Sequence, residues 1–354
     1  MFDLIIIKPF CREKSKTERL SNILDRSIAD YHYDVITTKE EFEHADLTGK
    51  KLIFAVSLGE SGINLEYYGI LKRIRLDQRC LQGCVAGIII DGNSELYTKS
   101  VARDLTFSAN LAGCTFVGKP LVEGTRTLKN YDVIAKNICA DQLEAYAVSA
   151  ELLVKSVVQF EMPKKESPNI LMLHSSNEKK SNTMTLWEMV KKHLEGCTIE
   201  EISLQNGEIY DCIGCPYTTC FHFGERNACF YGGLITEKVY PAVRACDALV
   251  MVCPNYNDAV GANIAAFINR LTSIFRTNKF SEKQLFALIV SGYSGGDIVA
   301  QQLISSLCMN KTLILPPRFA LIETANNPGD ILGIDGIEEE AREYAQNMLK
   351  QIKK

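Results

Sequence analysis

Four cysteines stand close together in the stretch CIGCPYTTCFHFGERNAC, which begins at Cys212 and ends at Cys229. Cys212 and Cys215 form a C-x2-C pair, and Cys220 and Cys229 follow at wider spacings. Four thiolates within one loop can surround a tetrahedral zinc ion or anchor a 4Fe–4S cluster. The third interpretation is that the thiols bind no metal and either line a redox site or form a labile disulfide. The spacing alone leaves all three interpretations open.

Three further stretches place polar or glycine residues directly after apolar runs: HSSNEKKSNT (174–183), CPNYNDAVGAN (253–263) and SGYSGGD (291–297). The first offers hydroxyls and free backbone amides at a helix start, which suits a phosphate group and equally an N-capped turn. The second and third can bring backbone and a tyrosine against a flat heterocycle, because glycine permits close approach; ordinary turns are the alternative. The absence of GxxxxGK[ST] and GxGxxG patterns here disfavours a P-loop or a dinucleotide fingerprint.

The elements that must position these loops alternate between short apolar runs and longer amphipathic stretches. Because ligands bind beyond the carboxyl ends of the strands in an open doubly wound parallel sheet, this α/β pattern places the three loops at one edge. In the second half we predict helices at Thr185–Leu194, Ala262–Phe275, Asp297–Leu307 and Ile337–Ile352. The predicted strands are Ile170–Leu173, Ile199–Leu204, Ala248–Cys253, Leu285–Val290 and a pair near Leu313–Leu315 and Phe319–Ile322.

The first half repeats this order of runs and loops. AGIIIDGNSE (86–95), for example, parallels FALIVSGYSGG (286–296). The stretch Pro163–Pro168, two prolines around charged residues, has the composition of a linker. We therefore predict two tandem doubly wound parallel sheets: a domain 1–162, a linker 163–168 and a domain 169–354. The cysteine-rich insertion 212–229 has no counterpart in the first half. Two unrelated α/β domains are the alternative to a duplication.

The second half resembles the flavodoxin-like NAD(P)H-dependent FMN reductase family, including its iron–sulfur flavoprotein branch. PNYNDAVGANIAAFINR (254–270) resembles the family's PVYFGNVSAQLKAFIDR and is the most specific match in the chain. SSNEKKSNT (175–183) is similar to the family's GSPRKNGNT in length and ending, but has Glu178 where a phosphate-binding arginine often stands. SGYSGG (291–296) looks like the family's glycine-rich third flavin loop.

The resemblance implies an FMN-dependent oxidoreductase that passes electrons from NAD(P)H to a quinone, nitroaromatic, flavin or metal acceptor. No side chain need act as a catalytic group, because the flavin carries the chemistry. A flavin and iron–sulfur electron carrier serving a partner protein is the alternative, and a binding module with an empty flavin site is a third class. The implied FMN-binding residues are Ser175, Ser176, Asn177, Ser181, Asn182, Thr183, Met184, Pro254, Asn255, Tyr256, Asn257, Ser291, Gly292 and Tyr293.

The resemblance also bears on the cysteines and on the first half. Iron–sulfur members of the family typically carry C-x2-C-x2-C followed by a fourth cysteine, whereas here Cys220 comes two residues late. A 4Fe–4S cluster, zinc or no metal at Cys212, Cys215, Cys220 and Cys229 therefore all remain interpretations. In the first half, SLGESGIN and DGNSEL replace the flavin loops, which predicts a degenerate flavodoxin-like domain without flavin.

The composition bounds the partners and the compartment. The 354 residues are 46% hydrophobic and carry a formal net charge of −4, which gives no support for a nucleic-acid partner. The sequence has no apolar run long enough for a membrane span or an export signal, so we expect a cytoplasmic protein. The 13 cysteines are odd in number, which argues against a fully paired disulfide framework. Related proteins are commonly dimers or tetramers, so the resemblance makes a homo-oligomer one possible arrangement; the alternative is that the fused first domain takes the partner's place.

Overall fold

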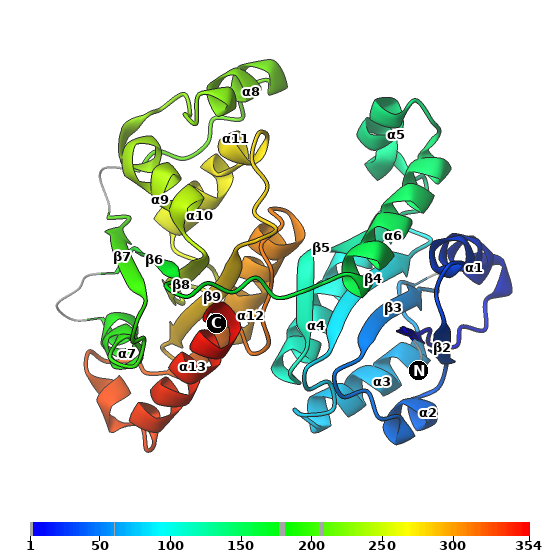
Figure 1. Cartoon of the computed structure of the whole chain (residues 1–354), viewed down its shortest axis with the longest axis horizontal. Coiled ribbons are helices and arrows are strands. Elements are labelled where there is room, and N and C mark those ends of the chain that lie inside the picture. The colour runs from blue at the N-terminus through cyan, green and yellow to red at the C-terminus, as the bar shows by residue number, and fades with distance from the viewer. Residues whose placement is uncertain (1–2, 60, 177–180, 206–208) are drawn as a thin grey trace. The chain divides into compact units, whose positions relative to one another are not determined.

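The computed structural model describes residues 3–59, 61–176, 181–205 and 209–354. The chain divides into two compact units, Met1–Glu161 and Met162–Lys354 (Figure 1). Each unit is built on one five-stranded sheet in which all pairs of neighbouring strands are parallel. Helices flank both sheets. The predicted fold, two tandem doubly wound parallel sheets, is confirmed.

The sheet of the first unit has the strand order β2-β1-β3-β4-β5. Its central strands read as nearly continuous apolar runs, as expected for strands covered by helices on both faces. The strands are β1 (Leu4–Ile7), β2 (Tyr33–Ile36), β3 (Lys51–Ser57), β4 (Val85–Asp91) and β5 (Thr115–Gly124). The helices are α1 (Lys14–Ile28), α2 (Lys39–His44), α3 (Leu65–Leu76), α4 (Thr98–Leu111), η1 (Lys129–Tyr131), α5 (Asp132–Ile138) and α6 (Gln142–Val158).

The second unit repeats the arrangement with the order β7-β6-β8-β9-β10. The strands are β6 (Asn169–His174), β7 (Thr198–Ser203), β8 (Ala248–Pro254), β9 (Gln284–Ser291) and β10 (Ala320–Thr324). The helical segments are α7 (Asn182–Lys191), α8 (Tyr217–Glu225), η2 (Ile235–Val239), α9 (Tyr240–Ala245), α10 (Ala262–Arg270), α11 (Thr272–Phe275), α12 (Gly296–Leu303), η3 (Ile304–Met309), η4 (Asp330–Gly333) and α13 (Ile337–Ile352).

Two local predictions differ from the structure. Leu313–Leu315 forms no strand of its own; Ile314 makes only an isolated bridge to Gln284. Pro316 and Pro317 follow at once, and proline has no N–H to extend a ladder. The helix predicted over Ala262–Phe275 is divided at Leu271 into α10 and α11.

One face of the second sheet is covered by α7 and α13. Trp187 from α7 and Met348 from α13 are buried in the same apolar cluster as Val250 and Leu288 of the central strands. The Trp187 indole also donates a hydrogen bond of 3.0 Å to Glu201 Oε1 on β7. This packing fixes the start of α7, which faces the carboxyl edge of the sheet.

The segment Pro163–Pro168 is hydrogen-bonded to the second unit. Lys165 N donates to Ile352 O at 2.9 Å, and Gln284 Nε2 donates to Pro163 O at 3.0 Å.

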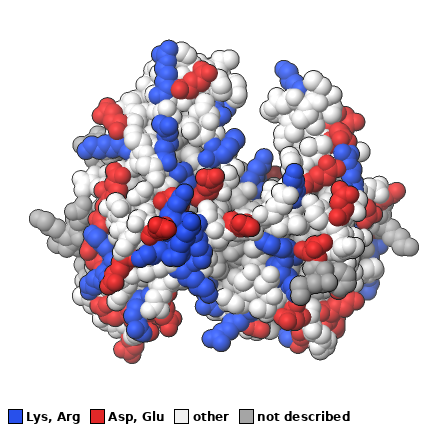
Figure 2. Space-filling view, viewed as in Figure 1, with Lys and Arg blue, Asp and Glu red and all other residues white. Residues whose placement is uncertain are grey.

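Figure 2 shows acidic and basic side chains both spread over one face of the molecule, in keeping with the small net charge. Among the described residues, no helix is long and apolar enough to cross a membrane.

Candidate functional site

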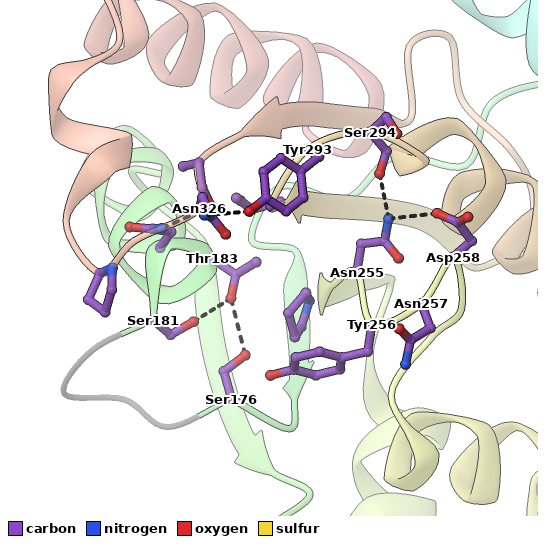
Figure 3. A pocket seen from close by; sticks show the side chains of 16 residues that line it. Ser176, Ser181, Thr183, Asn255, Tyr256, Asn257, Asp258, Tyr293, Ser294 and Asn326 are labelled. Carbon is purple, nitrogen blue, oxygen red and sulfur yellow. Dashed lines mark hydrogen bonds between the residues drawn. The ribbon is translucent and has the colours of Figure 1, made fainter.

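A polar pocket of about 600 Å³ lies at the carboxyl edge of the second sheet (Figure 3). The loops that follow β6, β8, β9 and β10 contribute its walls, as expected for a ligand site in a doubly wound sheet. The lining residues are Ser176, Ser181, Asn182, Thr183, Pro254, Asn255, Tyr256, Asn257, Asp258, Val290, Gly292, Tyr293, Ser294, Ala325, Asn326 and Pro328.

One wall is a chain of three hydroxyls at the start of α7. Thr183 Oγ1 lies 3.1 Å from Ser176 Oγ and 2.5 Å from Ser181 Oγ. Ser181 is the N-cap of α7, and its Oγ accepts a hydrogen bond from Met184 N at 3.4 Å. Hydroxyls and a helix N-terminus together favour an anion, because they offer donors and the positive end of the helix dipole.

Asn182 has a different role from its two neighbours. Its Nδ2 donates to Ala325 O at 3.1 Å and to Asn327 O at 2.8 Å, and its Oδ1 accepts from Gly329 N at 2.9 Å. The amide therefore uses both of its ends to hold the loop after β10. That loop forms a wall of the pocket that the sequence analysis missed.

Tyr256 is presented by a tight turn after β8. Tyr256 and Ala259 exchange backbone hydrogen bonds of 3.2 and 3.1 Å around two central residues. Those residues, Asn257 and Asp258, have φ values of +53° and +57°. Two consecutive positive φ angles define a type I′ turn, for which Asn and Asp are among the best tolerated residues. The Tyr256 side chain, 57% exposed, lies along the lower side of the pocket in Figure 3.

Asn255 joins the loops after β8 and β9. Its Nδ2 donates to Ser294 O at 2.8 Å and to Ser291 Oγ at 3.2 Å, and lies 3.3 Å from Asp258 Oδ1. Its Oδ1 is buried and has no hydrogen-bond partner in the part of the chain that the structure describes. A buried acceptor without a donor is unfavourable by about 1–3 kcal/mol. A ligand with an N–H group would remove that cost.

Gly292 and Tyr293 form the opposite side. The Tyr293 hydroxyl accepts a hydrogen bond from Asn326 Nδ2 at 3.2 Å, and its side chain is 82% exposed. A Cβ at position 292 would lie 2.9 Å from Asn326 Oδ1, so glycine keeps the pocket open here. Figure 3 shows Tyr293 and Tyr256 on opposite sides of the hollow. The two tyrosines therefore border the pocket from the loops after β8 and β9.

The comparison with protein families gives the identity of this unit. Residues 168–327 match the sequence model of the family described as NADPH-dependent FMN reductase. The second unit belongs to that family. The resemblance predicted for this half of the chain is thereby confirmed, and Met162–Lys354 is called the reductase domain below.

The solved structures to which this chain is similar are distant in sequence. RosB with a bound 8-demethyl-8-formylriboflavin-5'-phosphate intermediate is 17% identical, with a TM-score of 0.41, over 52% of this chain and 81% of that one. The NAD(P)H:quinone oxidoreductase from Methanothermobacter marburgensis is 14% identical, with a TM-score of 0.38, over 51% and 97%. The Trp repressor binding protein from Bacillus subtilis is 18% identical, with a TM-score of 0.35, over 50% and 99%. Among curated proteins, no sequence matches this chain.

Most of the residues predicted to bind FMN lie around the pocket of the reductase domain. Asn177 lies outside the described residues, as does Glu178. Met184 is buried in the apolar core instead of lining the pocket, and Ser291 lies behind Asn255. Ser175 Oγ is 3.1 Å from the point that a Cβ of Gly261 would occupy. The predicted residues that do line it are Ser176, Ser181, Asn182, Thr183, Pro254, Asn255, Tyr256, Asn257, Gly292 and Tyr293.

The four clustered cysteines line a second pocket of the reductase domain, of about 410 Å³. The segment that carries them is held by α11, whose Ser273 Oγ donates to Ala228 O at 2.5 Å and lies 3.4 Å from Cys220 O. The cysteines are Cys212, Cys215, Cys220 and Cys229. Within the described ranges, no three His, Cys, Asp or Glu side chains converge as they would around a metal ion. The donor set suits a metal, but the thiols would have to move closer together to share one.

The same sheet edge of the first unit holds an ion pair in place of a polar pocket wall. Arg19 from α1 donates to both carboxylate oxygens of Asp91, at 2.7 and 2.8 Å. Asp91 ends β4 and is 4% exposed. Arg19 Nη2 also donates to Thr125 O at 2.9 Å, in the loop after β5. The loops after β4 and β5 and the first turns of α1 are thus joined directly.

Proposed function

We propose that the reductase domain binds FMN non-covalently in the polar pocket and passes electrons from NAD(P)H to a small-molecule acceptor. The observation that carries the proposal is the buried Oδ1 of Asn255 at the junction of two loops, which has no hydrogen-bond partner among the described residues. A ligand donor would satisfy this atom, in a pocket that also offers a hydroxyl chain and two tyrosines. Bound FMN would supply the redox chemistry, accepting electrons from NAD(P)H and releasing them to the acceptor.

The hydroxyl chain fits the phosphate of FMN. Ser176 and Thr183 are 3% and 1% exposed, so their hydroxyls are already removed from bulk water. A phosphate placed at Ser181 would meet the start of α7 as well as these side chains. Asn182 would act indirectly, by holding the loop after β10.

The opposite end of the pocket fits the isoalloxazine ring. Asn255 Oδ1 would accept a hydrogen bond from a ring N–H, and Gly292 would let backbone approach the ring edge. Tyr256 and Tyr293 are exposed enough to leave one ring face open to nicotinamide and to an acceptor. A quinone, a nitroaromatic compound, a second flavin or a metal ion would suit such an open site.

Titration of the full chain with FMN and with riboflavin tests the binding site. Ser176→Ala and Thr183→Val should each weaken FMN about tenfold, which is the loss of one charge-assisted hydrogen bond. Riboflavin, which lacks the phosphate, should bind wild type and both variants equally. Equal losses for both ligands would place the phosphate elsewhere.

Steady-state oxidation of NADPH and NADH with menadione as acceptor tests the activity. We expect turnover by the FMN-loaded chain and none by the flavin-free chain. The alternative function is an electron carrier that serves a partner protein, for which the cysteine pocket is the supporting observation. A carrier would take up FMN but show no turnover with small acceptors.

For the cysteine pocket we propose a metal–thiolate group, either a 4Fe–4S cluster or a zinc ion. Cys212, Cys215, Cys220 and Cys229 would be its ligands, and a cluster would let electrons leave the flavin singly. Iron, sulfide and zinc per chain after anaerobic isolation and reconstitution distinguish the two. Light scattering of the same preparation measures the oligomeric state, for which a homo-oligomer stays the prediction.

A further inference from the structure

Arg270 is a buried cation that lines the cysteine pocket. It is the last residue of α10 and is 2% exposed. Its Nη2 donates to Gly232 O at 2.7 Å, its Nη1 donates to Tyr210 O at 3.3 Å, and its Nε has no partner among the described residues. The hydrogen bonds of Arg270 thus go only to backbone carbonyls, and no carboxylate in the described ranges pairs with it.

The position of Arg270 is fixed by the surrounding packing. Tyr240, which is buried, donates from its hydroxyl to Arg270 O at 2.5 Å. The guanidinium carbon lies 5.9 Å from the centroid of the Tyr231 ring. A buried charge without an opposite charge is unfavourable, because burial removes it from water and nothing compensates the loss. An anion is therefore expected beside Arg270 when the site is complete.

The lining of the pocket identifies the chemical class of that anion. No Asp or Glu is among the lining residues, but four cysteines are. A second guanidinium, that of Arg276, also lines the pocket; its Nε is buried without a partner among the described residues. Four thiolates around one divalent metal leave two net negative charges, which two guanidinium groups would balance.

We propose that Arg270, assisted by Arg276, is the counter-cation of an anionic metal–tetrathiolate group in the cysteine pocket. The inference rests on the metal–thiolate part of the proposed function. It adds that the pocket selects an occupant of net negative charge, and that Arg270 positions and stabilises this occupant without being a ligand. Buried N–H donors beside thiolate sulfur stabilise the more negative state of such a group.

Cobalt(II) alone is a suitable probe, because four thiolate ligands give it an intense charge-transfer absorption. The full chain would be reduced, freed of metal and titrated anaerobically with Co²⁺. We expect Arg270→Gln to weaken Co²⁺ at least tenfold, Arg276→Gln less, and Arg270→Lys to stay within about threefold of wild type, since one charge-assisted hydrogen bond corresponds to roughly tenfold. Arg226→Gln is the matched control. Arg226 is exposed at the end of α8, so this substitution removes the same charge and should leave the affinity for Co²⁺ unchanged.

Each outcome decides between the claims. Wild-type binding in Arg270→Gln, with an unchanged absorption spectrum, would overturn the counter-cation role while leaving the metal site intact. Equal losses in Arg270→Gln and Arg270→Lys would also overturn it, because a purely steric role is indifferent to the charge. A wild-type chain that binds neither Co²⁺ nor iron and sulfide would overturn the metal site together with this inference. FMN titration and thermal unfolding of the same proteins show whether flavin binding and folding are retained.

Discussion

The two units share one strand order and differ at the carboxyl edge of the sheet. In the reductase domain the loops enclose a polar hollow of about 600 Å³. In the first unit the corresponding loops are joined by Arg19 and Asp91. The register identifies the matching positions, since Asp91 pairs with Gly124 as Ser291 pairs with Thr324. The comparison shows how one edge of a fold either keeps room for a ligand or fills it with its own side chains.

The difference lies in how each unit holds the loop after its fifth strand. In the reductase domain the short amide of Asn182 binds the carbonyls of that loop. In the first unit the longer side chain of Arg19 donates to Thr125 O and also forms the ion pair with Asp91. A Cβ at Gly124 would lie 2.6 Å from Asp91 Oδ2, so the carboxylate packs directly against the backbone of β5. In the first unit an ion pair holds the loops at the carboxyl edge of the sheet together. In the reductase domain a bound ligand could do so.

Breaking the ion pair gives the largest expected effect. Arg19→Met leaves the carboxylate of Asp91 buried without a counter-charge, and we expect a loss of about 3–5 kcal/mol in the free energy of unfolding. Urea denaturation of the full chain, followed by circular dichroism, measures it. FMN bound per chain should not change.

The double variant Arg19→Met with Asp91→Leu is the control. Because it removes both charges, it should recover most of the lost stability. A first unit that gained FMN in either variant would contradict the view that the ion pair is structural. So would Arg19→Met at wild-type stability.

Removing the amide of Asn255 has the next largest effect, on the ligand instead of the fold. Asn255→Ala eliminates the buried Oδ1 and the cross-links to Ser291 and Ser294. We expect FMN affinity to fall by about 10- to 100-fold, the equivalent of one or two hydrogen bonds. Fluorescence titration with FMN measures the change.

Asn64 in the first unit is a matched control for Asn255. It is 3% exposed and follows β3. As the N-cap of α3, its Nδ2 donates to Ser57 O and its Oδ1 accepts from Tyr67 N, at 2.9 Å each. Asn64→Ala should lower stability by about 1 kcal/mol, as for a lost cap, and leave FMN affinity unchanged. Equal FMN losses in the two variants would mean that Asn255 acts only through stability.

The parts of the site that the sequence could predict are local in the chain. PNYNDAVG carries its own turn chemistry, since Asn257 and Asp258 tolerate positive φ beside Tyr256. SSNEKKSNT carries an N-cap in Ser181. Both patterns are complete within a few residues, so reading them requires no knowledge of the packing.

The parts that could not be predicted depend on partners far apart in the chain. Asn182 reads as a phosphate ligand until its partners, 143 and 145 residues away, are known. Arg19 and Asp91 are 72 residues apart, and nothing local to α1 indicates the pair. Met184 follows two polar pocket residues, but the helical period turns its side chain into the core.

The smallest effect concerns one strand position at which both units carry a glutamate but in different surroundings. Glu323 of β10 occupies the register position of Glu123 of β5. Partial burial and the neighbouring carboxyl of Glu340 raise the pKa of Glu323 to about 7. Glu123 instead accepts from Thr98 Oγ1 at 2.8 Å and lies 3.7 Å from Lys99 Nζ.

A carboxyl whose pKa is higher in the folded state stabilises the fold only while it is protonated. Its contribution is complete below the unfolded value, near 4.5, and is lost as the pH rises through about 7. Because Glu323 is half-exposed and solvent screens it, the loss should be no more than about 1 kcal/mol. Glu323→Gln should therefore stabilise the chain at pH 8 and have no effect at pH 4.5, as measured by urea denaturation.

Glu123→Gln, which removes an acceptor and a partner of Lys99, should give no gain in stability at either pH. A gain at pH 8 in both variants would mean that general acidity, not the Glu323–Glu340 pair, sets the pH dependence.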